Sequence, residues 1–196
     1  MPAINSLTEK DVSASIADFE TKRLLRTMID GTVMQVEAGA GITSGSGTVY
    51  RSSVTKNNGL IETKILIDLT GLSSSTTDLD IIGTGTAPAH LGQISLARSG
   101  TILSGTMTCL EVPAGGVTDI DLYSASEATG VFDGGIGALT ETALITAGGA
   151  WTLALTKAIG QAAATDQYLY LTGGAAGTAA AYTAGKFLIT LHGYNA

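Results

Sequence analysis

Hydrophobic and polar residues alternate with a period of two along much of this chain, the pattern of half-buried β-strands. The clearest case is a pair of segments, Thr48–Lys56 and Leu60–Leu69, separated by Asn57-Asn58-Gly59, which is typical of a tight hairpin turn. The pattern predicts one apolar face on the second strand. Its members are Ile61, Thr63, Ile65, Ile67 and Leu69, with Glu62, Lys64, Leu66 and Asp68 opposite them.

Seven further segments carry strand patterns, and glycine-rich stretches that suit turns lie between many of them. The predicted strands are Thr32–Glu37, Gln93–Arg98, Gly105–Val112, Asp119–Ser124, Trp151–Lys157, Gln167–Thr172 and Lys186–Tyr194. Residues 130–147 fit either a short strand or a turn. Helical patterns between strands are nearly missing, which disfavours parallel βαβ units. We therefore predict an all-β fold, a jelly-roll-type two-sheet antiparallel sandwich, with an immunoglobulin-like sandwich as the alternative.

Charge divides the chain into two parts. Residues 1–30 carry nine charged side chains, and the other 18 of the 27 are spread over the remaining 166 positions. We predict an N-terminal arm over residues 1–30 and a β-sandwich body over residues 31–196. Two interpretations of the arm stay open. Val12, Ile16 and Phe19 have helical spacing, whereas an extended arm could gain structure on a partner.

Composition argues against several classes of function. A net charge of −7 repels phosphate backbones, so nucleic-acid binding is not expected. No apolar run is long enough for a membrane span, and the first 30 residues lack the apolar core of a signal peptide. Two histidines and one cysteine provide few catalytic or metal-binding groups. We predict a protein that is not an enzyme and needs no cofactor, with Cys109 buried in an apolar strand.

Two acidic pairs, Asp78 with Asp80 and Asp119 with Asp121, each place two carboxylates on one side of an extended segment. Such pairs can contribute to a calcium site, which takes six or more oxygen ligands. No third acid lies near either pair in sequence, so solvent-facing acids are the simpler interpretation and no metal site is predicted.

Aromatic residues are scarce, at ten of 196, and three of them occupy informative positions. Trp151 begins an alternating segment, which favours a place in the core. Tyr168 and Tyr170 share one face of a predicted strand. They are candidates for partner binding, either as a platform for a sugar ring or as part of a subunit contact.

The segments Glu111–Leu122 and Gly185–Tyr194 resemble small virion structural proteins of tailed bacteriophages, in particular head decoration (cement) proteins with jelly-roll bodies. The likeness covers roughly the body from Leu60 onward and consists of strand and turn patterns without a catalytic set. It implies a homotrimer on the capsid surface of a virion, made in the cytoplasm of a host bacterium. Such a trimer would bind the major capsid protein lattice and stabilise the head.

The same resemblance implies that the arm reaches along the shell. Three basic residues flanked by apolar ones are the candidates for that contact, although the solvated face of an ordinary helix fits them equally. These residues are Phe19, Lys22, Arg23, Leu24, Leu25 and Arg26. The alternative function is a receptor- or glycan-binding head of a phage tail fibre or similar appendage, against which the scarcity of aromatic residues counts.

Overall fold

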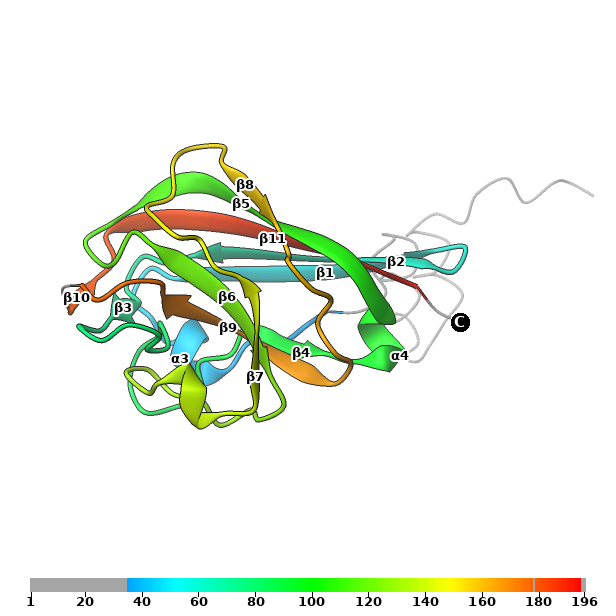
Figure 1. Ribbon diagram of the computed structural model, residues 1–196, viewed down its shortest axis with the longest axis horizontal. Helices are drawn as coiled ribbons and strands as arrows, with labels where there is room; N and C mark the ends of the chain where they lie inside the picture. The colour runs from blue at the N-terminus through cyan, green and yellow to red at the C-terminus, as the bar shows by residue number, and fades with distance from the viewer. Residues whose placement is uncertain (1–34, 178, 195–196) are drawn as a thin grey trace, which may run out of the picture.

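The computed structural model describes residues 35–177 and 179–194, which form an all-β sandwich of two antiparallel sheets (Figure 1). The larger sheet has the order β1 (Val49–Asn57), β2 (Leu60–Asp68), β11 (Ala184–Tyr194), β5 (Thr101–Ala114) and β8 (Thr156–Ala158). The smaller has the order β4 (Gly92–Ile94), β9 (Gln167–Gly173), β6 (Ile120–Ala125) and β7 (Glu141–Ile145). The predicted fold class is confirmed as an all-β antiparallel sandwich.

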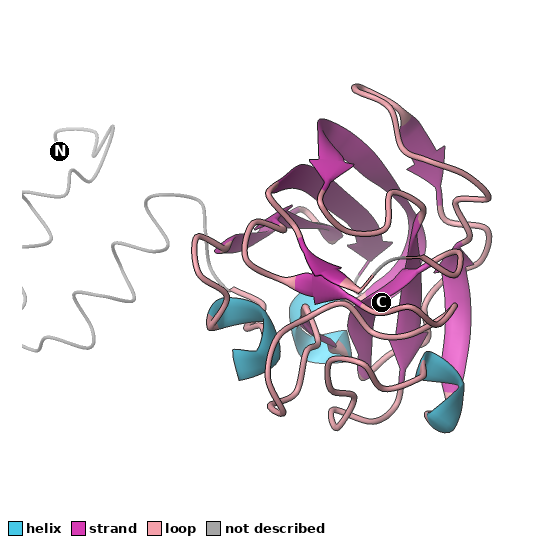
Figure 2. Cartoon of the chain, turned by 90° about the vertical axis from the view of Figure 1, so that its left-hand side faces the viewer, coloured by secondary structure: helices cyan, strands magenta, loops and turns pink. Residues whose placement is uncertain are grey.

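Short elements connect the strands of these sheets; Figure 2 shows the helices in cyan. They are the helices α3 (Ala40–Thr43) and α4 (Leu96–Ser99), the 3₁₀ turn η1 (Ile136–Ala138), and the two-residue strands β3 (Ser73–Ser74) and β10 (Ala180–Ala181), which pair with each other. Within residues 35–177 and 179–194, none of the helices exceeds four residues. The sheets therefore carry the fold in the described part of the chain.

Eight of the strands pair in a nested order. In chain order these strands are β2, β4, β5, β6, β7, β8, β9 and β11. The first pairs with the last, the second with the seventh, the third with the sixth, and the fourth with the fifth. A long antiparallel hairpin folded over on itself gives this order. Strand β1 lies outside it, as an additional edge strand beside β2.

The core lies between the sheets and is built by alternation along their strands. On β11, Phe187, Ile189 and Leu191 are fully buried, as are the predicted inward residues of β2. Trp151 is 1% exposed; its indole Nε1 donates to the Ile120 carbonyl oxygen, and its ring meets that of Phe187 edge-on at 5.2 Å. Cys109 is buried too. The core positions predicted for Trp151 and Cys109 are confirmed.

The predicted hairpin is confirmed, with Asn57 opposite Leu60 across a two-residue turn. Two other strand predictions were partly wrong. The segment Gln93–Arg98 leaves the sheet after Ile94, because the Ser95 hydroxyl caps a helical turn by accepting from the Arg98 amide. Of Trp151–Lys157, only the end pairs as a strand, because Ala154 has a φ of 65° that interrupts an extended chain.

Two more predictions concern the stretch 130–147 and the segment Thr32–Glu37. The uncertain stretch 130–147 contains both a 3₁₀ turn and strand β7. The described part of Thr32–Glu37, which is residues 35–37, forms no strand in the sheets. The predicted arm over residues 1–30 lies outside the described residues, so the boundary at residue 30 stays a prediction.

The hairpin turn offers a direct test of backbone chemistry. Asn58 and Gly59 have φ values of 50° and 87°, both left-handed, which suits a type I′ turn. We expect Gly59→Ala to lower the free energy of unfolding by about 1 kcal/mol, because a Cβ disfavours that conformation. The control, Asn58→Gly, should be nearly neutral in the same denaturant titration. Equal effects of the two substitutions would contradict the turn assignment.

Candidate interaction surface

On the outer face of the five-stranded sheet, outward-pointing side chains of several neighbouring strands line up. We call it the outer face and define it by the residues that alternate away from the core. They are Val49, Arg51, Ser53 and Thr55 on β1; Leu60, Glu62, Lys64, Leu66 and Asp68 on β2; Lys186, Leu188, Thr190, His192 and Tyr194 on β11; and Leu103, Ser104, Thr106, Thr108 and Glu111 on β5. Three zones of different chemistry follow one another along it.

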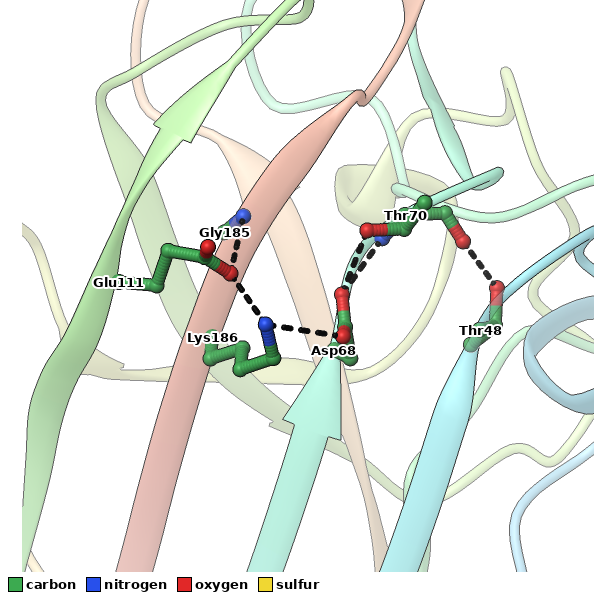
Figure 3. A network of polar contacts seen from close by, with 6 residues as sticks. All are labelled: Thr48, Asp68, Thr70, Glu111, Gly185 and Lys186. Carbon is green, nitrogen blue, oxygen red and sulfur yellow. Dashed lines mark hydrogen bonds and ion pairs between the residues drawn. The ribbon is translucent and has the colours of Figure 1, made fainter.

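An ion-pair network occupies one end of the outer face (Figure 3). The Lys186 ammonium lies 2.5 Å from a Glu111 carboxylate oxygen and 3.2 Å from an Asp68 carboxylate oxygen, so it links three neighbouring strands. Both the amide and the hydroxyl of Thr70 donate to the other oxygen of Asp68, at 3.0 and 2.7 Å. The Thr48 hydroxyl donates to the Thr70 carbonyl oxygen and ties in the chain before β1.

The network shifts the titration of its three charged groups. Burial of Asp68 acts to raise its pKa, but the hydrogen bonds from Thr70 and Lys186 outweigh that effect and hold the pKa below its usual value. The hydrogen bond from Lys186 lowers the pKa of Glu111 in the same way, and the bonds to Glu111 and Asp68 raise the pKa of Lys186. All three groups are therefore charged at neutral pH.

The middle of the outer face mixes apolar, charged and short hydroxyl side chains. Leu66 on β2 lies opposite Leu188 on β11, and the Lys64 ammonium lies 2.6 Å from a Glu62 carboxylate oxygen. Thr190 on β11 lies opposite Thr106 on β5 and Lys64 on β2. The hydroxyls of Thr108 and Thr156 share a hydrogen bond of 2.9 Å between β5 and β8. The threonine side chains are branched at Cβ and therefore stiff, so they have few rotamers to lose on docking.

Large apolar side chains gather at the other end. Leu60 and Tyr194 lie directly opposite each other on β2 and β11, and Leu103 occupies an irregularity of β5 where the register with β11 shifts. Leu60 is 66% exposed and Leu103 is 60% exposed. Water-exposed leucines at neighbouring positions favour removal of their surface from water by a partner, at about 25 cal/mol per Å².

The tyrosines predicted to bind a partner both lie on β9 in the smaller sheet, away from the outer face. Tyr170 is fully buried; its hydroxyl donates to the Glu127 carbonyl oxygen and accepts from the Gly130 amide. It therefore presents no ring surface to solvent in the described chain. Tyr168 is half-buried, with its ring 4.9 Å from the His90 ring, and a partner contact there stays a prediction.

The six candidate residues of the arm, Phe19, Lys22, Arg23, Leu24, Leu25 and Arg26, lie outside the described residues. Their part in partner binding stays a prediction. The network of Asp68, Glu111 and Lys186 was not predicted. The alternation of β2 and β11 places Asp68 and Lys186 on polar faces. Only the strand register shows that these two residues and Glu111 lie next to one another.

Three members of the two acidic pairs interact in the structure, because Asp78 and Asp119 both act electrostatically on Asp121. An Asp121 carboxylate oxygen accepts from the Ala147 amide at 2.5 Å, and burial raises the pKa of Asp121, with Asp119 and Asp78 adding to the effect. One oxygen of Asp119 has no hydrogen-bond partner among the described residues. Over the described chain, no group of three or more histidine, cysteine or acidic residues is arranged to hold a metal ion.

Comparisons of the chain with protein-family models, with curated proteins and with solved structures give no match. Within residues 35–177 and 179–194, no helix has the length and apolar character needed to cross a membrane. The function must therefore be argued from the chain's own surface.

The network makes a prediction about stability. We expect Asp68→Ala to lower the free energy of unfolding by about 1–2 kcal/mol, because it leaves the Thr70 donors and Lys186 without their acceptor. The control is Asp78→Ala, which removes an exposed carboxylate and should change stability by less than about 0.5 kcal/mol.

The same pair of variants tests the pH dependence. Asp68 and Glu111 have lowered pKa values in the folded state, so their contribution is complete above the ordinary carboxyl pKa of about 4 and is lost as the pH falls through the lowered values. The difference in free energy of unfolding between Asp68→Ala and the unsubstituted chain should be constant near pH 7 and shrink below about pH 3. A deficit that stayed constant into acid would contradict the network.

Proposed function

We propose that this chain is a non-enzymatic virion structural protein, a capsid decoration protein that binds the major capsid protein lattice of a tailed bacteriophage and stabilises the head. The observation that carries the proposal is the outer face, a flat sheet surface with exposed leucines at one end and an ordered ion-pair network at the other. Such a surface suits docking onto another protein. The sequence resemblance supplies the class of partner.

The strand order supports the same proposal at the level of architecture. We propose that the nested pairing of eight strands in two facing sheets makes the sandwich a jelly roll, a fold that occurs in viral capsid domains and in lectins. Because one fold serves many functions, the strand order reduces the number of possible functions but does not select one of them. Exposed aromatic platforms would favour the glycan-binding alternative, and the burial of Tyr170 removes one of its two candidates.

The size of the outer face fits a contact that is repeated many times. The four strands that form the outer face, β1, β2, β11 and β5, have 9 to 14 residues each. At ~3.3 Å per residue and a spacing of about 4.8 Å they offer roughly 700 Å². A standard stable interface buries about 800 Å² on each partner. A single contact through this face would therefore be modest in strength, and the proposed trimer would gain affinity by engaging several lattice subunits at once.

The proposal predicts that head binding depends on the apolar end of the outer face. We expect the double variant Leu60→Glu and Leu103→Glu to remain folded, because both side chains are mostly exposed, and to lose at least tenfold in affinity for purified heads, which corresponds to about 1.4 kcal/mol. Binding is measured by co-sedimentation with heads.

The matched control is Leu79→Glu. Leu79 is an exposed leucine whose amide bonds to Gly173 of the smaller sheet, so its change should leave binding intact. Equal binding by the double variant and the unsubstituted chain would contradict the assignment of the outer face.

The arm makes a separate prediction. A chain lacking residues 1–30 should fold and form trimers, because the proposal assigns trimer formation to the sandwich body, yet it should bind heads weakly or not at all. Light scattering measures the assembly and co-sedimentation measures the binding. Retained head binding would refute the role of the arm while leaving that of the outer face open to the leucine variants.

A further inference from the structure

The loop of residues 146–155, which joins β7 to β8, is fastened to the body at Ala147 and at Trp151 (Figure 1). The Trp151 side chain is buried in the core, and its backbone amide donates to the Thr118 carbonyl oxygen at 3.1 Å. Between the two fastened residues, Gly148 and Gly149 have φ values of 65° and 149°. Because glycine has no Cβ and turns easily about such angles, these two residues can serve as a hinge.

The backbone of Ala147 is held on both sides by charged side chains. Its amide donates to an Asp121 carboxylate oxygen at 2.5 Å, and its carbonyl oxygen accepts from the Lys157 ammonium. The same ammonium lies 5.7 Å from the centre of the Trp151 ring. Ala147 and Asp121 are both buried. The loop can leave the body at its β7 end only if both of these hydrogen bonds break.

A second carboxylate lies beside that of Asp121. One oxygen of Asp119 and one of Asp121 lie 2.7 and 2.8 Å from the point that a Cβ on Gly174 would occupy, so both border the same small space above this glycine. The same Asp119 oxygen is buried and has no hydrogen-bond partner among the described residues. A buried acceptor without a donor is costly, and a proton on the neighbouring carboxyl group would supply the donor.

Most of the charge around Asp121 is negative. Burial is the main cause that raises the pKa of Asp121, and the carboxylates of Asp119 and Asp78 add to the rise. The hydrogen bond from Ala147 and the charge of Lys157 lower this pKa, but they do not cancel the rise. Further titratable groups of this neighbourhood are Tyr123 on β6 and Glu141 on β7.

We propose that Asp119 and Asp121 share one proton in mild acid, and that this proton fastens the loop of residues 146–155 to the body. The proton lies between the two carboxyl groups, where it supplies the donor that the Asp119 oxygen lacks, while Asp121 still accepts from the Ala147 amide. When the proton leaves for solvent, two buried carboxylates repel each other. Asp121 then gains by moving into water, which breaks its bond to Ala147.

The direction of the pH effect follows from the linkage between docking and protonation. The docked loop buries Asp121 and raises its pKa, so docking and protonation favour each other. We expect the loop to be held most firmly below the raised pKa and to loosen as the pH rises through it. This direction is opposite to that of the Asp68 network, whose contribution is lost as the pH falls.

Nuclear magnetic resonance of the full, unsubstituted chain tests the proposal without any variant. The carboxyl carbon shift of Asp121 should titrate with a midpoint above the ordinary carboxyl value of about 4. Over the same pH interval, the protection of the Ala147 amide against hydrogen exchange, corrected for the intrinsic pH dependence of exchange, should fall by roughly threefold or more. A midpoint at or below the ordinary value, or protection that does not change with pH, would overturn the proposal.

The variant Asp121→Asn imitates the shared proton, because its amide group keeps an acceptor for Ala147 and offers an uncharged donor to Asp119. We expect the Ala147 amide of this variant to keep its acid level of protection up to about pH 7. The matched control is Asp133→Asn, the same change at an exposed acid, which should leave the pH dependence of the unsubstituted chain intact.

Two outcomes with these chains would contradict the shared proton. The first is an Ala147 amide that loses protection with rising pH in Asp121→Asn as much as in the unsubstituted chain. The second is protection at neutral pH that a chelator abolishes, because a bound cation would then stand where the proposal places the proton.

Discussion

The structure depends on the insertion of the last strand, β11, between β2 and β5. These neighbours lie far away along the sequence, and without β11 the larger sheet would separate into a hairpin and an isolated strand pair. The alternating sequence of β11 supplies side chains to both faces of the sheet. Phe187, Ile189 and Leu191 enter the core, while Lys186 and Thr190 join the outer face.

The position of β11 also explains the ion-pair network. Lys186 reaches both Asp68 and Glu111 only because its strand runs between theirs, in a register that places all three at the same end of the sheet. The ion-pair network therefore forms only when β11 pairs with β2 and β5 in this register. Because most of these contacts join distant parts of the sequence, chain closure is entropically costly and we expect folding to be slow for a chain of this size.

The local features of the fold could be predicted from sequence, and the long-range ones could not. The hairpin followed from Asn58 and Gly59 and from the alternation of β2, because turn and strand patterns lie within a few residues of one another. The error after Ile94 had a local cause as well, a Ser95 cap that competes with the strand pattern. The partners of β11 needed the register of strands 70 or more residues apart in sequence, which no periodicity encodes.

The outer face could not be predicted from the sequence for the same reason. Each outward residue of β2 was assigned to a polar face, but the union of β2, β11 and β5 into one surface depends on their order in the sheet. Leu103 precedes the predicted strand Gly105–Val112, and only the register shift of β5 opposite His192 and Gly193 shows why it is exposed. Tyr170, chosen as a surface residue from alternation, is buried because segments outside its strand supply partners for its hydroxyl.

The proposed function joins these features into one physical argument. A rigid sandwich presents a flat face of modest area, and many copies on a symmetric lattice would turn weak contacts into a stable layer. Electron cryomicroscopy of heads mixed with the purified chain tests this account most directly. The account predicts ordered density on the shell, with the five-stranded sheet turned toward the capsid protein. Undecorated heads, or density with the four-stranded sheet against the shell, would contradict it.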